Sequence, residues 1–223
     1  MRKISMNKKI LTATLFLILF LTLTGCLDTF EEEKKVERVL LKGSPSEENY
    51  QQSQKYFLEG NYSEALKYDE KQLEEDLRYF KEQSAEIAVD YNNIGLDYDN
   101  LKEYNKALEY YKKAMKIDEI VLPQNSIERA TTYYNIASSY ASLEEYNLSL
   151  DYFHKTLKID IYEENVVASY QEMGTIYEKT KNYKRSFHYY TKALKLQEKL
   201  YPKEDEKIFT TKSKLRELGK HLK

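Results

Sequence analysis

Apolar and polar residues alternate along most of this chain at steps of three and four, which is the period of an amphipathic α-helix. Two apolar runs are joined by a short polar break, such as the one from Leu101 to Tyr104, and the pair of runs then recurs. Each copy is centred on a small residue at Gly95, Ala137 or Gly174. This pattern predicts a series of helical hairpins.

The copies also share their aromatic residues. A tyrosine stands four residues before each small residue, and further tyrosines follow three and nine residues after it. A second small residue comes at twelve, and an aromatic residue at sixteen: Tyr111, Phe153 and Tyr190. Self-similarity at a period of about 40 residues indicates a solenoid, in which each hairpin buries its apolar face against the next. We expect Gly95 and Ala107 to lie where the two helices of one hairpin cross.

A degraded fourth copy precedes these three, with Ser53 in the small position. Asn49 and Asp69 stand where aromatic residues are expected, and terminal repeats are often atypical because one face meets water. Its first helix should begin at the capping sequence Ser44-Pro45-Ser46-Glu47.

The spacing of large and small residues from about Ser84 to Leu200 resembles the tetratricopeptide repeat, and the long repeats resemble the kinesin-light-chain subset. The resemblance implies an all-α, right-handed solenoid of about four helix-turn-helix repeats over residues 44–201. An irregular helical bundle with coincidental spacing is the alternative.

A capping helix is expected within residues 202–223. It would bury one face and expose a basic one; membrane contact by this helix is a minor alternative, because acidic residues interrupt the basic face. The expected buried residues are Ile208, Thr211, Leu215, Leu218 and Leu222.

The amino terminus has a basic head and an apolar run from Ile10 to about Leu23, a pattern typical of a secretion signal. The sequence Leu23-Thr24-Gly25-Cys26 resembles the bacterial lipoprotein box. The resemblance implies removal of residues 1–25 by a type II signal peptidase and lipid attachment at Cys26, the only cysteine. An uncleaved anchor with an incidental cysteine is the alternative.

Residues 26–43 would form the lipidated terminus and a linker, either a short helix or a disordered tether. In lipoproteins of bacteria with two membranes, aspartate directly after the lipidated cysteine retains the protein at the inner membrane. Leu27 stands there in this chain, so the resemblance favours the outer membrane for such a source. The expected location is a bacterial membrane, facing the periplasm or the exterior.

The charge argues against nucleic acid as a partner. The full chain has a formal net charge of −2, and loss of residues 1–25, with four basic residues and no acidic one, makes it −6.

No motif for metal binding, phosphate binding or nucleophilic catalysis occurs, and six glycines leave little material for catalytic loops. His154 and His188 stand at different repeat positions and should lie on solvated helix surface. We therefore expect no enzyme activity, no metal site, no catalytic residue and no cofactor.

In the repeat family the first helix of each hairpin lines the concave side. The resemblance places a peptide-binding groove there, and amide side chains, which donate and accept at once, suit an extended peptide backbone. Solvated asparagines without a ligand are the alternative. The row contains no lysine or arginine, so a carboxylate clamp is not expected. The candidate groove residues are Asn92, Asn93, Tyr134, Asn135, Gln171 and Glu172.

These observations predict a membrane-anchored lipoprotein that acts as a non-catalytic protein- or peptide-binding scaffold in the bacterial cell envelope. A repeat protein that senses a short free peptide is the alternative.

Overall fold

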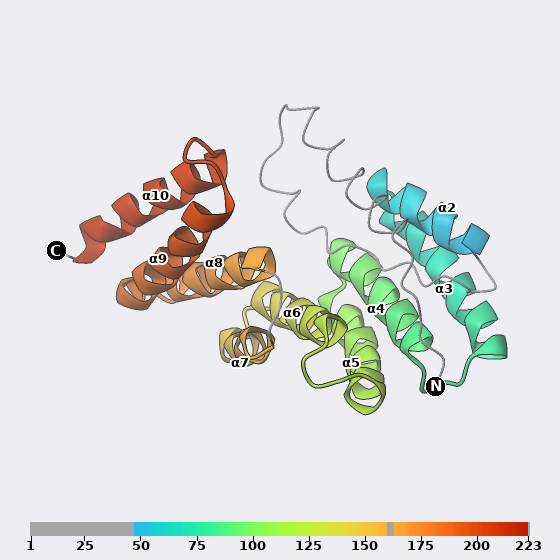
Figure 1. Cartoon of the computed structure of the whole chain (residues 1–223). Coiled ribbons are helices and arrows are strands. Elements are labelled where there is room, and N and C mark those ends of the chain that lie inside the picture. Colours follow the sequence, from blue (N-terminus) through green and yellow to red (C-terminus); the bar gives the residue numbers. More distant parts are fainter. Residues whose placement is uncertain (1–46, 160–162, 223) are drawn as a thin grey trace, which may run out of the picture. The chain divides into compact units, whose positions relative to one another are not determined.

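The computed structural model describes residues 47–159 and 163–222, and within these ranges every regular element is helical (Figure 1). The expected all-α fold is confirmed. The expected start at Ser44, the linker and Cys26 lie outside the described residues. The elements are α2 Glu47–Leu58, α3 Tyr62–Tyr79, α4 Ala85–Asn100, α5 Tyr104–Val121, α6 Ile127–Ser142, α7 Tyr146–Leu157, α8 Glu163–Lys179, α9 Tyr183–Leu200, α10 Glu206–Leu218 and the 3₁₀ turn η2 Gly219–Leu222.

Consecutive helices pair into four hairpins, α2–α3, α4–α5, α6–α7 and α8–α9, and each hairpin packs on the next. The turn inside every hairpin contains one residue with positive φ, seven positions after the small residue. This left-handed residue ends the first helix and lets the chain reverse. It is a glycine only in the first hairpin; the four residues are Gly60, Lys102, Glu144 and Lys181.

The small residues lie at the helix crossings, as the pattern predicts. The Tyr111 ring packs directly on Gly95, and the Tyr190 ring packs on Gly174 in the same way. Ala107 is fully buried. Ala137 and Phe153 share one apolar cluster with Met173 of the next hairpin, so the core is continuous from one repeat to the next.

A column of three tyrosines joins the two helices of each of the last three hairpins. Tyr110 of α5 lies between Tyr91 and Tyr98 of α4, with ring centroids 6.1 and 5.5 Å away. The Lys113 ammonium lies 4.5 Å from the Tyr110 ring centroid and adds a cation–π contact. The central tyrosines of the other two columns are Tyr152 and Tyr189. A tyrosine followed three residues later by lysine marks this position in each of the three copies.

The final helix α10 covers the last hairpin through Ile208, Thr211 and Leu218, which are buried as expected. Leu222 is 45% exposed, so its expected burial is wrong: α10 ends at Leu218, and η2 turns Leu222 off the helical stripe. No helix within the described ranges is both long enough and apolar enough to span a bilayer.

Candidate functional site

The first helices α4, α6 and α8 form one face of the array, because α4 contacts α6 and α6 contacts α8. We call this the first-helix face, and the side formed by α5, α7 and α9 the second-helix face. All six candidate groove residues belong to α4, α6 or α8. Four of them are half-buried: Asn92, Tyr134, Gln171 and Glu172.

The other two candidates, Asn93 and Asn135, are only 7% and 5% exposed. The expectation that both face solvent is therefore wrong. Packing between hairpins buries the side chains two positions before Gly95 and Ala137, whereas Gln51 and Glu172 at the same repeat position are exposed and half-buried. A partner lying on this face would meet the neighbours of Asn93 and Asn135 first.

Hydrogen bonds across the seam between hairpins compensate for the burial of the Asn135 amide. The Asn135 amide donates to Asn92 Oδ1 at 3.1 Å, and the Asn92 amide donates to Thr132 Oγ1 at 3.3 Å. Thr132 in turn donates to Asp118 Oδ2 at 2.7 Å. The network joins α4, α5 and α6, so these amides hold two hairpins in register. Asn92 remains half-buried and keeps part of its side chain at the surface.

The Asp118–Thr132 pair has a counterpart at the first junction. Asp118 stands 23 residues after Gly95, and Thr132 stands five residues before Ala137. At the junction between the first two hairpins, the same two repeat positions are occupied by Asp76 and Asp90. Burial raises the pKa of Asp118 to about 6, and the hydrogen bond from Thr132 opposes this rise. The matching placement puts a polar pair at each of the first two junctions between hairpins, and we call these two pairs joints.

The first joint contains two carboxyl groups where the second has a carboxyl and a hydroxyl. Asp76 and Asp90 are 2% and 5% exposed, and the Gln72 amide donates to Asp76 Oδ2 at 2.6 Å. Burial, together with the nearby Asp76 and Asp69 carboxylates, raises the pKa of Asp90 to about 9. Asp90 is thus protonated at neutral pH, and its proton lets two carboxyl groups lie together.

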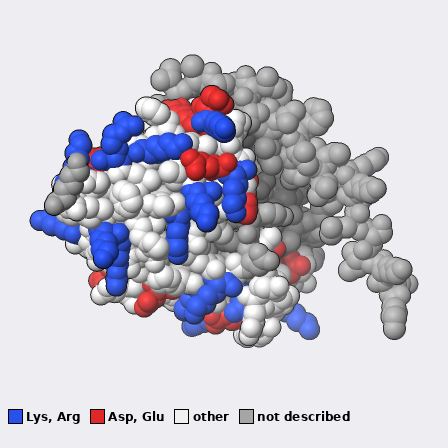
Figure 2. All heavy atoms as spheres, turned by 60° about the vertical axis from the view of Figure 1, so that its left-hand side comes forward, with Lys and Arg blue, Asp and Glu red and all other residues white. Residues whose placement is uncertain are grey.

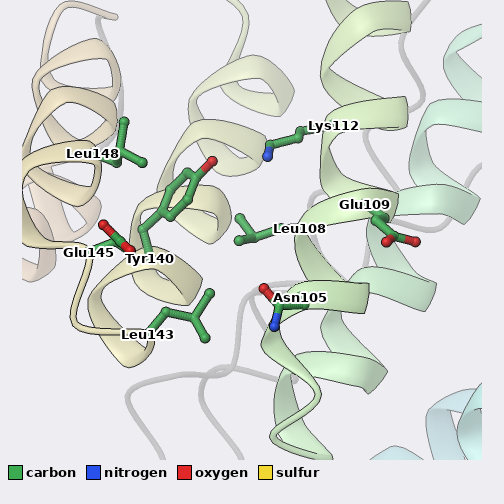
Figure 3. A pocket seen from close by; sticks show the side chains of 8 residues that line it. All are labelled: Asn105, Leu108, Glu109, Lys112, Tyr140, Leu143, Glu145 and Leu148. Atoms are coloured by element: carbon green, nitrogen blue, oxygen red, sulfur yellow. The ribbon is translucent and has the colours of Figure 1, made fainter.

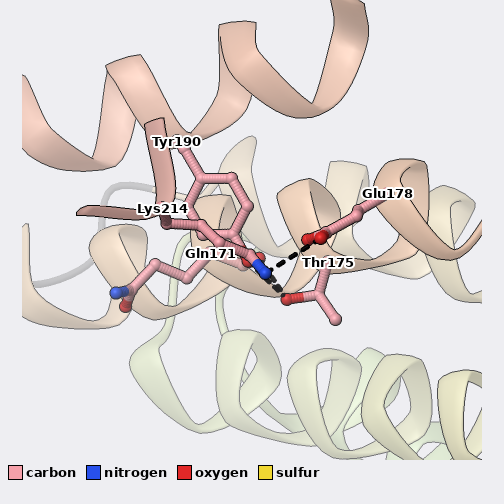
Figure 4. Close-up of polar contacts among 5 residues, drawn as sticks. All are labelled: Gln171, Thr175, Glu178, Tyr190 and Lys214. Carbon is pink, nitrogen blue, oxygen red and sulfur yellow. Dashed lines mark hydrogen bonds and ion pairs between the residues drawn. The ribbon is translucent and has the colours of Figure 1, made fainter. Parts of the chain in front are cut away.

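The C-terminal end of the first-helix face contains a polar group built from three helices (Figure 4). Lys214 of α10 reaches Glu178 of α8, with Nζ 2.9 Å from Oε1. Beside this pair, the Thr175 and Tyr190 hydroxyls lie 2.8 Å apart, and Gln171 lies next to them. The row itself has no basic residue, as expected, but α10 brings one to its end. Lys214 lies outside the repeats, so the repeat pattern does not point to it.

The second-helix face contains a depression of about 460 Å³ between α5 and α7 (Figure 3). Tyr140 of α6 forms its floor, with the Lys112 ammonium 5.3 Å from the Tyr140 ring centroid. Leu148 on its rim is 42% exposed.

Titratable side chains show no catalytic arrangement in the part of the chain that the structure describes. His154 and His188 are exposed, as expected, and no cluster of three or more histidine, cysteine, aspartate or glutamate residues could hold a metal ion within these ranges.

The sequence matches the model of the tetratricopeptide repeat over residues 48–120 and 128–199. The chain belongs to the tetratricopeptide repeat family. The two matched segments begin in the first and third hairpins, so the degraded first copy is a member of the array. Tetratricopeptide repeats generally mediate protein–protein interactions, and the fold is typically a non-catalytic scaffold. No protein with a curated function matches the sequence.

Solved structures share the repeat architecture. The nearly identical TPR-like repeats attributed to a Podosopora anserina kinesin light chain align with a TM-score of 0.68 and 13% identity, over 78% of this chain and 85% of that one. BtubC (BKLC) from P. vanneervenii aligns with a TM-score of 0.65 and 19% identity, over 75% of this chain and 69% of that one. MamA aligns with a TM-score of 0.53 and 21% identity, over 71% of this chain and 81% of that one. At these identities the likeness extends to the fold alone.

Proposed function

We propose that this protein is a lipid-anchored, non-catalytic adaptor of the bacterial cell envelope that binds a protein or an extended peptide segment along its first-helix face. The observation that carries the proposal is the row of half-buried polar side chains on three adjacent helices. The row runs from Asn92 on α4 through Tyr134 on α6 to Gln171, Glu172 and Thr175 on α8.

The chemistry of the row suits a peptide backbone. Each amide can donate and accept one hydrogen bond at the same time, and a backbone presents both kinds of group at every residue. The Lys214–Glu178 pair at one end adds charges of both signs. A partner segment of mixed polarity, with its basic side chains toward Glu172, matches this surface better than a strongly anionic one.

Attachment to a membrane rests on the amino-terminal sequence. A lipid on Cys26 supplies two or three acyl chains, and each buried methylene contributes roughly 0.8 kcal/mol, which makes the anchor stable where a single chain is marginal. The residues between Cys26 and α2 would then serve as the tether that connects the array to the bilayer.

Site-specific photocrosslinking in cells tests the groove. A photoreactive amino acid at Gln171 or Asn92 should form adducts with a partner, and the same group at exposed His188 on α9 should not. Mass spectrometry of the adducts then identifies the partner. A folded protein supports the adaptor, whereas a short peptide supports the sensing alternative. Adducts that form only from His188 would place the contact on the second-helix face and overturn the proposal.

A further inference from the structure

The charges of this protein are segregated along the chain. Residues 47–178 contain 13 Lys and Arg against 27 Asp and Glu. Residues 179–222 contain 13 Lys and Arg against only five Asp and Glu. Helices α9 and α10 thus form a strongly basic end on an acidic array. Figure 2 shows this end, where lysine and arginine side chains spread over much of the visible surface.

The basic side chains gather on one side of this end. On α9, exposed Lys184, Lys195 and Lys199 recur at helical spacing and project to the same side. On α10 the corresponding stripe consists of exposed Lys212 and Arg216, continued by Lys220 in η2.

Two contacts join the stripes edge to edge. Lys212 Nζ lies 2.8 Å from Glu198 Oε1 of α9, and His221 stacks on Tyr183 with ring centroids 4.2 Å apart. We call the joined stripes the C-terminal basic face. Lys214 projects from another side of α10 toward Glu178, so the basic face and the first-helix face are separate surfaces.

An aromatic side chain projects from the basic stripe of α10. Phe209 is 69% exposed, and it precedes Lys212 by three residues and Arg216 by seven, so all three lie along one side of the helix. A large exposed phenylalanine costs solubility and gains nothing in the core. Together with Lys212 and Arg216 on the same side of α10, it has the composition of a peripheral membrane contact, in which basic side chains meet anionic headgroups and an aromatic ring enters the interface.

We propose that the C-terminal basic face docks on the surface of an anionic lipid bilayer. Lysine predominates over arginine, which suits diffuse attraction to headgroups rather than bidentate recognition of a defined site. Five acidic residues do not balance the thirteen basic ones of residues 179–222. Glu198 neutralises Lys212, and Asp205 caps α10 by accepting from the Lys207 backbone N–H, but Lys184, Lys195, Lys199, Arg216 and Lys220 remain on the face. Docking leaves the first-helix face accessible. The inference rests on the envelope location in the proposed function, because an anchored chain is already close to a bilayer.

Lysine footprinting of the full-length chain tests the proposal. The chain is reconstituted through its N-terminus into vesicles of phosphatidylcholine alone, or of phosphatidylcholine with roughly one-third phosphatidylglycerol. A membrane-impermeant amine reagent and mass spectrometry then report the accessibility of each lysine. Lys116 and Lys158 are internal controls, because both are exposed and stand at the repeat position of Lys195.

We expect labelling of Lys184, Lys195, Lys199 and Lys220 to fall about threefold or more in anionic vesicles, and to recover when added salt shortens the screening length. Labelling of the two control lysines should stay constant. Phe209→Ala, or Lys195→Glu with Lys199→Glu, should restore labelling of Lys184 and Lys220. Lys116→Glu with Lys158→Glu should have no effect.

Equal labelling in both vesicles would overturn the proposal. Protection by added polyglutamate but not by anionic vesicles would also overturn it, and would indicate an acidic protein partner instead. If the N-terminal lipid anchor is wrong, the chain will not float with the neutral vesicles, a result that is independent of the basic face. If partner binding on the first-helix face is wrong, only the crosslinking experiment will show it.

Discussion

The Tyr111 ring lies against Gly95 so closely that a Cβ atom at the glycine would come within 2.6 Å of ring carbons Cδ1 and Cε1. In the same way, a Cβ atom at Gly174 would come within 2.8 Å of ring carbons Cδ2 and Cε2 of Tyr190. In both hairpins the aromatic residue sixteen positions later takes the volume that a side chain would occupy. These two crossings leave no room for a methyl group unless the tyrosine ring moves, whereas the third hairpin packs Ala137 in the same cluster as Phe153.

Gly95→Ala should destabilise the array by about 1–3 kcal/mol, because the buried Tyr111 ring must move to admit the methyl group. Gly95→Leu or Ala107→Leu should cost at least as much. Thermal or denaturant unfolding measures the effect, and Gly219→Ala, with no atom within 4 Å of the added Cβ, is the control. Equal stability of Gly95→Ala and the parent chain would mean that the crossing assigned here is wrong.

Asp90→Thr should stabilise the protein above neutral pH. The pKa of Asp90 is raised to about 9 in the folded state from 3.8, so the folded chain holds a proton that the unfolded chain releases. The contribution of Asp90 to folding stability is fully present below about pH 4 and is lost as the pH rises through about 9. Threonine at position 90 would reproduce the arrangement of Thr132 at the next joint and would not lose stability with pH. The free energy of unfolding should rise by an amount on the order of 1–3 kcal/mol at pH 8–9.

Unfolding curves from pH 4 to 9 test this expectation, with Asp151→Thr on the exposed side of α7 as the control. The gap between Asp90→Thr and the parent chain should widen as the pH rises. A constant gap would show that the two carboxyl groups of the first joint do not share a proton.

Glu144→Gly should stabilise the third hairpin by about 1 kcal/mol. Glu144 has a φ of 63°, a left-handed conformation that costs about 1–2 kcal/mol for a residue with a Cβ atom. Gly60→Ala is the reverse experiment, because Gly60 has a φ of 75° and open space around it, so only the backbone conformation is penalised. Chemical denaturation should give changes of opposite sign for these two variants.

Asn135→Ala should lower stability by about 0.5–1.5 kcal/mol, since it removes the hydrogen bond to Asn92. The matched control is Asn147→Ala, which truncates an exposed asparagine on α7. An unchanged melting temperature for Asn135→Ala would show that the amide is available to a partner after all. The photocrosslinking experiment would then be repeated from residue 135.

Lipid attachment at Cys26 predicts a mass change. Protein extracted from membranes should lack residues 1–25 and carry added acyl mass, and Cys26→Ser should block processing. The measurement is intact mass spectrometry with and without the substitution. A full-length, unmodified chain that remains on the membrane would point to an uncleaved apolar anchor instead.

The repeat fold was predictable because its determinants are local and recur. Gly95 and Tyr111 are sixteen residues apart in one hairpin, and the same spacing relates Gly174 to Tyr190, so the sequence alone carries the hairpin, its crossing and the number of copies. Helical periodicity also sufficed to place Ile208 and Leu218 on the buried side of α10.

The surfaces were less predictable, because they depend on how one hairpin meets the next. Asn93 and Asn135 stand at positions that look exposed on an isolated helix, yet packing of neighbouring first helices buries both. The pKa of Asp90 rises because packing of α3 on α4 buries the carboxyl group, and the nearby Asp76 adds to the rise. Lys214 reaches the end of the row only when α10 packs on the last hairpin. Periodicity describes contacts within a helix or a hairpin. Burial and charge at the seams follow from contacts between hairpins, and tertiary packing alone creates those.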